Sequence, residues 1–547
     1  MASDGEASIA SILWQLPEAR KYARKSLLAP FIQGLADGSV ALESFYELLF
    51  KEAAFLDICS RALIEGATLA KSASFPEAEQ AFLKLKGAVA EEMKIHQPVL
   101  ASPDASGCEI FPGMTHPATE AYMSFLLEAA KRTQNMEDSS RASWCALARL
   151  CSGLAPRYRL YACLGTALAG TGCLESAGEV LGKWIKDYSS DEFQRCANGH
   201  DALLDACWSA ATAEMDAIGR KALMDEMVDI YLVALSSRQL SFNELSSTHE
   251  PVKGDMANLL LRSAKIVPPR VLIVAGSDSG GGAGIQADIK SCSALGAFSM
   301  TAIAALTAQN THGVQGIFPV PVPFVQQQIR SVLDDIGADV VKTGMLANAE
   351  VVSAVAAELG KQQLVVDPVM VSTSGHVLLE SDAVETVKRE LFPLATIITP
   401  NLHEARLLLD GRVINSVLHM EQAARDLCKF GPEWVLVKGG HLCSTEDGGG
   451  GDAVANPSKF AIDVLCCRQS GKCEHFSSAM IQTKNVHGTG CTLASSIAAL
   501  MANGETVPDA VRKAKEYLSS AIAASAHLHL GSGKQGPMNH CWAIANW

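Results

Sequence analysis

The stretch VLIVAGSDSGGGAGIQAD, residues 271–288, decides the fold class of the C-terminal half of the chain. Its opening run, Val271–Val274, is apolar and short enough to be a buried strand, and the glycines that follow predict a tight turn. From Ala283 to Leu295 apolar residues recur at helical spacing. A strand, a turn and a helix in this order predict the first unit of an α/β fold.

Further short apolar runs follow, and helical segments separate most of them. They are Thr301–Ala308, Val340–Leu346, Leu364–Met370, Thr396–Thr399 and Trp434–Val437. This alternation predicts repeated βαβ units and a mostly parallel central sheet. Ligands of such open sheets bind beyond the carboxyl ends of the strands. We therefore expect the functional residues directly after each strand.

The N-terminal half has a different pattern. Between Glu43 and Leu63, apolar residues recur at the three- and four-residue steps of a core-facing helix. Similar stripes lie at Ala78–Ile95, Thr119–Ala130, Ser143–Leu154 and Ala222–Leu235. A polar stretch from Ser246 to Asp255 and the pair Pro268-Pro269 mark a linker. We predict an all-α domain over residues 1–250, a linker over 251–268 and an α/β domain over 269–535.

Composition excludes several classes of protein. Of the 547 residues, 48% are hydrophobic and 19% charged, an ordinary globular balance. The net charge of −14 argues against nucleic acid as a partner, and no apolar run reaches the roughly 20 residues of a membrane span. Scattered cysteines and an N-terminus without signal or transit character predict a cytoplasmic protein. The spacing of Cys466, Cys467, Cys473 and His475 fits no standard zinc site, so we expect no structural metal.

Two motifs point to a small-molecule ligand. Gly276 and Asp288 belong to the glycine-rich segment, where the backbone can approach a ligand closely. A tight strand-to-helix turn without a ligand is the alternative. Gln309, in TAQNTHG at residues 307–313, offers a donor and an acceptor that suit the edge of a heteroaromatic ring. A simple turn residue is the alternative there.

Two more motifs point to a nucleotide and a cation. DPVM at residues 367–370 and TPNLHE at 399–404 place oxygen-bearing side chains at adjacent strand ends, which suits Mg²⁺ held with ATP phosphates. Asn401 and Glu404 also fit a helix capping box, and the two roles are compatible. Lys438 follows a buried strand and is either a point charge for phosphate or a solvated turn lysine.

The segment VHGTGCT, residues 486–492, is the strongest signal. Glycines before a helix N-terminus offer free N–H groups to an anion, and Gly488, Thr489 and Gly490 would form such an anion hole. Cys491 stands where the helix dipole would lower its pKa, so it could take the proton of an attacking hydroxyl. An inert, buried thiol is the alternative.

Residues from about 268 to 530 resemble hydroxymethylpyrimidine kinase/phosphomethylpyrimidine kinase of the ribokinase superfamily. The segments that carry the resemblance, in order, are AGSDSGGGAGIQAD, LGAFSMTAIAALTAQNTHGVQG, DDIGADVVKTGML, DPVM, TPNLHEA, VKGGH and HGTGCTL. The resemblance implies phosphorylation of 4-amino-5-hydroxymethyl-2-methylpyrimidine and of its monophosphate, with ATP and Mg²⁺ as cofactors. A pyridoxal-type kinase and a non-catalytic vitamin sensor are alternatives. Family members are commonly oligomeric, so a homo-oligomer is expected.

The same resemblance assigns roles to individual residues. Gly276, Asp288 and Gln309 would hold the pyrimidine, and Cys491 would be the catalytic residue of the anion hole. Asn401, Glu404, Lys438 and Thr489 would stand near ATP and Mg²⁺. The segment from Ser444 to Ala461, with its run of glycines, is longer than usual in the family.

The helical half resembles the TenA family of aminopyrimidine hydrolases, or thiaminase II, whose all-helical fold is haem-oxygenase-like. The carrying segments are PFIQGLADG at residues 30–38, AYMSFLL at 121–127, LAPRYRLYACLG at 154–165 and KWIKDYSSDEF at 183–193. Tyr122, Tyr161 and Tyr188 match pocket positions of that family. Three positions depart from it, because Glu52 replaces an aspartate, Arg157 replaces the nucleophilic cysteine, and Gln239 replaces a late catalytic glutamate.

The departure at Arg157 removes the covalent mechanism, because a guanidinium is neither nucleophilic nor deprotonated in proteins. Glu52 lies on the apolar stripe of its helix, so we expect it to face inward, with Arg157 as its partner. The half is then an altered hydrolase that uses Glu52, a binding or oligomerisation module, or an enzyme with a changed substrate.

Overall fold

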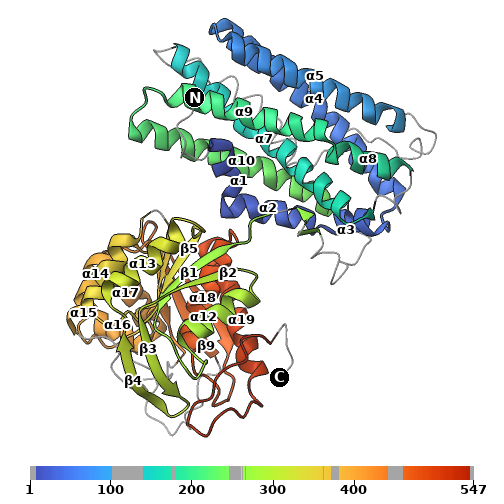
Figure 1. The fold of residues 1–547 in the computed structure, drawn as a ribbon. Helices are drawn as coiled ribbons and strands as arrows, with labels where there is room; N and C mark the ends of the chain where they lie inside the picture. The colour runs from blue at the N-terminus through green and yellow to red at the C-terminus, as the bar shows by residue number, and fades with distance from the viewer. Residues whose placement is uncertain are drawn as a thin grey trace. The chain divides into compact units, whose positions relative to one another are not determined.

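The structure, a computed structural model, describes residues 8–100, 139–173, 179–245, 260, 261, 263, 264, 266–360, 362–370, 381–440 and 460–542. The chain divides into two compact units, residues 1–267 and 268–547 (Figure 1). The first unit is helical and the second is α/β, so both predicted fold classes are confirmed. Within the described ranges, no helix combines the length and the apolar character needed to span a membrane.

The helical unit packs its helices around one apolar core. The helices are α1 (Ile9–Gln15), α2 (Pro17–Leu27), α3 (Pro30–Asp37), α4 (Leu42–Ser72), α5 (Pro76–Leu100), α7 (Ser139–Gly170), α8 (Glu179–Ser189), α9 (Asp191–Thr212) and α10 (Ala217–Glu244). Phe45, Leu48 and Leu56 of the predicted α4 stripe are buried in that core. The side chains of Ser190 and Asp216 cap α9 and α10. The predicted stripe Thr119–Ala130 lies outside the described residues.

The α/β unit is built on an eight-stranded sheet in the order β10-β9-β8-β7-β6-β5-β1-β2. Its strands are β1 (Arg270–Ala275), β2 (Phe298–Ile303), β5 (Val340–Thr343), β6 (Gln363–Val366), β7 (Ile397–Ile398), β8 (Trp434–Lys438), β9 (Phe460–Cys467) and β10 (Cys473–Ala479). The strands from β2 to β8 in this order pair in parallel, and β9 and β10 pair antiparallel at the edge. The mostly parallel sheet of the expected ribokinase-like fold is thus confirmed.

Helices cover both faces of the sheet, as Figure 1 shows. They are α12 (Gly284–Ala294), α13 (Val322–Leu333), α14 (Ala349–Glu358), α15 (Ser381–Thr386), α16 (Leu402–Leu408), α17 (Val417–Leu427), α18 (Thr489–Ala502) and α19 (Val507–Ala524), with short helical turns at Val387–Leu391, Phe392–Leu394 and Cys428–Phe430. Leu272 and Val274 of β1 enter one core, whereas Val271 and Ile273 enter the core that holds α18. A strand buried on both faces must be apolar throughout, which explains its sequence.

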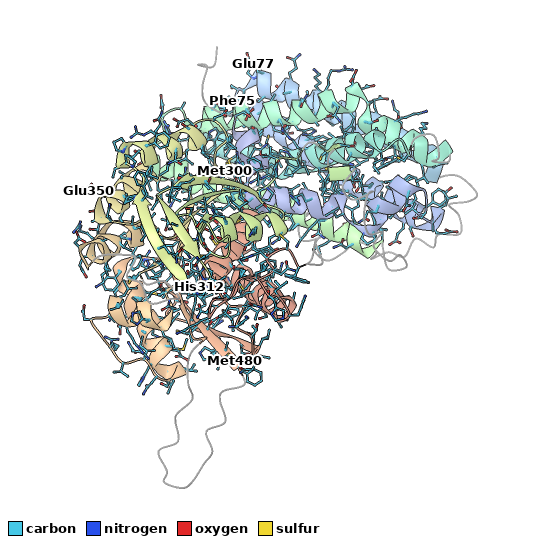
Figure 2. The ribbon with its side chains drawn as sticks, turned by 60° about the horizontal axis from the view of Figure 1, so that its bottom comes forward. Phe75, Glu77, Met300, His312, Glu350 and Met480 are labelled. Carbon is cyan, nitrogen blue, oxygen red and sulfur yellow. The ribbon has the colours of Figure 1, made fainter. Side chains whose placement is uncertain are left out.

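The apolar run Thr301–Ala308 is not the single strand that we predicted. β2 ends at Ile303, and the chain then enters a separate two-stranded sheet of β3 (Ala305–Asn310) and β4 (Gly313–Pro319). The run contains no break in polarity, so its period could not reveal the change of sheet. The hairpin turn carries His312, labelled in Figure 2, whose Nε2 lies 3.0 Å from Ser532 Oγ.

Two sequence-based expectations fall partly outside the described residues. Most of the predicted linker lies there, and β1 begins after Pro268 and Pro269. Residues 444–459 of the long segment lie there as well, but Phe460 and Ala461 begin β9. The end of that segment is therefore part of the sheet.

Candidate active site

The carboxyl ends of the parallel strands bring charged side chains together. Asp367 follows β6, and its Oδ1 lies 2.8 Å from Nζ of Lys438 at the end of β8. The Thr399 hydroxyl donates to the same Oδ1 at 3.0 Å. A Cβ built on Gly490, in the first turn of α18, would stand 3.4 Å from Lys438 Nζ. The predicted anion loop and the predicted phosphate lysine are thus neighbours, as sheet topology requires.

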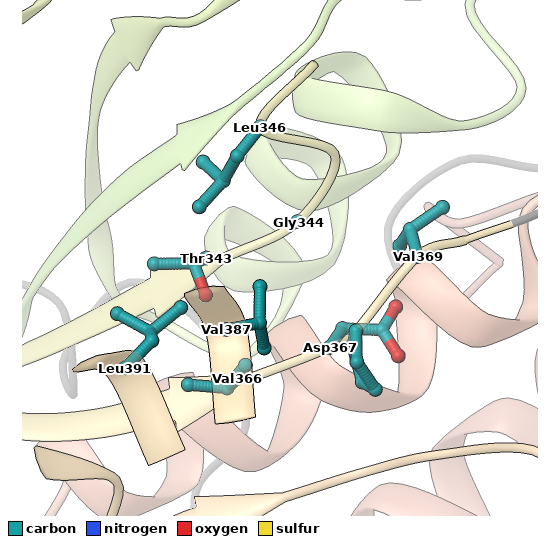
Figure 3. A pocket seen from close by; sticks show the side chains of 9 residues that line it. Thr343, Gly344, Leu346, Val366, Asp367, Val369, Val387 and Leu391 are labelled. Carbon is teal, nitrogen blue, oxygen red and sulfur yellow. The ribbon is translucent and has the colours of Figure 1, made fainter. Parts of the chain in front are cut away.

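A small pocket opens at the ends of β5 and β6, next to this ion pair. Thr343, Gly344, Asp367 and Val369 contribute to its lining, together with apolar side chains that include Leu391. Figure 3 shows Thr343 and Asp367 at the ends of neighbouring strands. The ends of the strands therefore supply both the charged side chains and the pocket of the candidate site.

Asn401 and Glu404 form the capping box that was one of the two readings of their motif. The Asn401 side chain accepts from Glu404 N at 2.9 Å, and Glu404 Oε2 accepts from Asn401 N at 2.8 Å. Burial raises the pKa of Glu404 to about 7, Lys438 opposes that rise, and the Asp367 carboxylate adds to it. Carboxylate oxygens of this kind are the ligands that Mg²⁺ prefers.

The anion loop has the geometry that its glycines predict. Gly488 adopts a φ of 88°, and a Cβ at this position would stand 1.9 Å from the carbonyl oxygen of Gly282. Only glycine permits both the left-handed conformation and this close approach. Among the described residues, no side chain caps α18, which begins at Thr489. The Thr489 N–H donates to the Val486 carbonyl at 3.4 Å, so the N–H groups of Gly490 and Cys491 are the ones in position for an anion.

The expectation of a low pKa for Cys491 is wrong for the protein alone. Removal from water raises the pKa of the Cys491 thiol to about 12, and the nearby Asp288 and Asp367 carboxylates add to the rise. Lys342 acts in the opposite direction. Burial and the two carboxylates therefore outweigh the opposing effect of Lys342 on the pKa of the thiol.

Asp288 lies deeper than its predicted role as a pyrimidine ligand suggested. It is fully buried, and its carboxylate oxygens lie 2.9 and 3.0 Å from Lys342 Nζ. The Ser495 hydroxyl donates to Oδ1 at 2.6 Å. Lys342 lies in the apolar run of β5. Its only sequence signal was a single charge within a buried strand, so it was not among the predicted site residues.

The two other predicted pyrimidine residues line the glycine-rich turn. Gly276 donates its N–H to the Met345 carbonyl at 3.0 Å, and a Cβ on Gly276 would stand 2.3 Å from Met345 Cε. Gln309, on β3, places its amide nitrogen 3.2 Å from Nε2 of His487. His487 and its partner Asp278 lie inside two motifs that we quoted, but their residue types alone gave no role.

Comparisons with known proteins identify this unit. The family model for phosphomethylpyrimidine kinase matches residues 278–539. The hydroxymethylpyrimidine/phosphomethylpyrimidine kinase of Streptomyces coelicolor is 48% identical over 282 residues, which cover 51% of this chain and 97% of that protein. The chain belongs to the hydroxymethylpyrimidine/phosphomethylpyrimidine kinase family. The anion loop, Lys438 and the Asn401–Glu404 box thus lie within the matched region of this kinase.

Other similar proteins have other names or are longer than the matched region. A probable thiamine biosynthetic bifunctional enzyme of rice, named as chloroplastic, is 48% identical over 279 residues, or 50% of this chain and 48% of that protein. The chain thus spans about half the length of such plant relatives. A pyridoxal kinase structure from Staphylococcus aureus shows 30% identity and a TM-score of 0.44, and covers 50% of this chain and 94% of that one.

The helical unit holds a second group of buried charges. Arg157 on α7 places Nη2 2.7 Å from Glu52 Oε2 and 2.8 Å from Glu92 Oε1. Arg238 on α10 approaches Glu52 Oε1 at 2.7 Å. Glu52 and Arg157 are each 1% exposed, so the inward position of Glu52 and its pairing with Arg157 are confirmed. Sequence reasoning missed Glu92 and Arg238. Gln239, named as the position of the family's late glutamate, is buried next to Arg238 in α10.

Two tyrosines of the predicted pocket donate hydrogen bonds to the carboxylates of this cluster. Tyr161 donates its hydroxyl to Glu52 and Tyr188 donates to Glu92, both at 2.6 Å. Burial by itself would raise the pKa of Glu52, but Arg238, Arg157 and the Tyr161 hydrogen bond lower it to about 2. A carboxylate with so low a pKa is a poor proton acceptor at neutral pH. Tyr122 lies outside the described residues.

Replacement of Arg157 by Ala should lower the free energy of unfolding of the helical unit by about 3–5 kcal/mol, because Glu52 and Glu92 would lose their shared buried cation. Calorimetry of the full chain would measure the loss. Arg149→Ala is the matched control, since Arg149 lies on the same helix and pairs with the half-exposed Glu226, and should cost less than about 1 kcal/mol. Equal losses in the two variants would show that the buried pairing has no special weight.

Proposed function

We propose that the α/β unit transfers the terminal phosphoryl group of ATP to 4-amino-5-hydroxymethyl-2-methylpyrimidine, and then to its monophosphate. The observation that carries the proposal is the convergence of the Gly488–Cys491 loop with Lys438 and Asp367 at one edge of the sheet. The N–H groups and the lysine of such a site stabilise the charge on a phosphoryl group because they already face it before the reaction. The 48% identity to a kinase of this name supports the choice of alcohol.

The residues of the site suggest how the transfer proceeds. Lys438 and the N–H groups of Gly488–Cys491 would hold the phosphates and the charge that develops on them. The pyrimidine would lie over Gly276 and Gln309, with its hydroxymethyl oxygen in line with the terminal phosphorus. Asp288 is buried, and its carboxylate is already paired with Lys342. It would therefore support the pyrimidine site indirectly. The buried pair Glu404 and Asp367 fits Mg²⁺, which would neutralise phosphate charge when bound.

The full-length protein should consume ATP when it is given Mg²⁺ and the hydroxymethyl aminopyrimidine, and should form the mono- and diphosphate. Chromatography that separates the two products would measure both steps, and pyridoxal would serve as the comparison alcohol. Turnover of pyridoxal alone would make the unit a pyridoxal-type kinase. No turnover of either alcohol would replace the proposal by the sensor reading.

Cys491→Ala should reduce kcat by about 10²–10⁴-fold if the thiol removes the proton of the attacking hydroxyl. A base whose pKa is about 12 in the protein alone gains thiolate as the pH rises. The turnover of the unchanged protein should therefore increase by about tenfold per pH unit between neutral and mildly alkaline pH. Cys467→Ala, at the end of β9, is the control. An undiminished rate in Cys491→Ala would limit Cys491 to packing.

We propose that the helical unit is a binding or oligomerisation module and not a hydrolase. The support is that Arg157 occupies the position of the family nucleophile and that its partner Glu52 is too weak a base. The full chain should therefore release no hydroxymethylpyrimidine from the aminomethyl analogue or from thiamine. Arg157→Cys, which restores the nucleophile type, is the comparison variant. Hydrolysis by the unchanged protein would overturn this proposal.

The homo-oligomer and the cytoplasmic location remain predictions.

A further inference from the structure

Asp278 connects the glycine-rich turn to the anion loop. It is 2% exposed, and its Oδ2 lies 3.0 Å from Nε2 of His487, the residue before Gly488. Its carboxylate also accepts the N–H groups of Gly280 at 2.8 Å and Ala283 at 2.8 Å. One buried carboxylate therefore holds two loops that are distant in sequence.

Asp278 is an ionised acceptor at neutral pH. Burial alone would raise its pKa, but the hydrogen bonds from His487 and from the Gly280 and Ala283 backbone hold the pKa below its usual value. A carboxylate has no proton to give. The ring nitrogen of His487 that faces it must therefore carry the hydrogen.

This proton constrains the amide group of Gln309. The same His487 Nε2 lies 3.2 Å from the Gln309 amide nitrogen. Two N–H donors cannot bond to each other, so a hydrogen bond here requires that the amide oxygen faces the ring instead. The His487 N–H would then be shared between Asp278 and Gln309.

Thr307 sets the same constraint from the other side. Its hydroxyl donates to the Ser277 carbonyl at 2.8 Å, which uses its only hydrogen. The Gln309 amide oxygen lies 3.4 Å from that hydroxyl oxygen. Thr307 can only accept a second bond, so it pairs with Gln309 when the amide presents its NH₂ group. Two independent neighbours thus favour one orientation.

We propose that His487 and Thr307, through Asp278 and Ser277, fix the Gln309 amide with its oxygen toward His487 and its NH₂ toward Thr307, and so determine specificity. This inference rests on the proposed kinase function. In this orientation the Gln309 amide keeps one N–H donor and one oxygen lone pair for a ligand. The relative positions of this donor and this acceptor are then fixed. An aminopyrimidine presents an amino donor next to a ring-nitrogen acceptor, which that order matches. His487 is in this sense a positioning residue.

His487→Ala should raise KM for the aminopyrimidine alcohol about tenfold, the size of one lost hydrogen bond. This rise should exceed any change in kcat or in KM for ATP, because His487 contacts Gln309 directly and reaches the phosphate site only through the loop that it precedes. KM for pyridoxal, which lacks the amino group, should change less. His487→Gln, which keeps an N–H donor, should restore most of the affinity. His475→Ala, in the exposed pair with Glu421, is the control.

A general loss of kcat, with KM for ATP raised as much as KM for the alcohol, would overturn the proposal in favour of simple packing of the anion loop. A neutron structure of the unchanged full chain provides a reading that needs neither activity nor a folded variant, because it distinguishes nitrogen from oxygen and locates deuterium. Gln309 oxygen toward a deuterated His487 Nε2 is expected. The opposite amide orientation would refute the inference, whereas absent turnover with the expected orientation would refute only the proposed function.

Discussion

The ion pair between Lys438 and Asp367 is the interaction on which the α/β unit depends. It joins the ends of β6 and β8, and the first turn of α18 packs over it at Gly490. Both charges lie in protein that is largely closed to water, where an unpaired charge would cost several kcal/mol. Each can remain only because the other is present, and the same pairing leaves Lys438 partly exposed at the edge where a phosphate would bind. The ion pair that stabilises the fold therefore also contains the ammonium group that would bind a phosphate.

A neighbouring pair follows the same rule at greater depth. Asp288 and Lys342 are fully buried and compensate one another below Cys491. Their charges act on the thiol in opposite directions, and the carboxylates together with burial are stronger. The pKa of Cys491 is thus determined by burial and by side chains of α12, β5 and the end of β6, and not by the motif to which it belongs.

The helical unit contains a larger network of buried ion pairs of the same kind. Arg157 and Arg238 both contact Glu52, and Glu92 shares Arg157. The hydroxyls of Tyr161 and Tyr188 donate to carboxylate oxygens that the arginines also contact. The carboxylates of Glu52 and Glu92 are thus engaged by side chains of this unit, which agrees with the proposal that the unit is not a hydrolase.

The sequence by itself determined the fold classes, since a helical stripe and short runs buried on both faces follow from local periodicity. It also determined the anion loop and the capping box, because glycines and capping residues act on their own backbone. Only the tertiary structure decided the pKa of Cys491, the depth of Asp288, the change of sheet after Ile303 and the contact of Arg238 with Glu52. Each of these depends on side chains that are far away in the chain, and no local pattern records their approach.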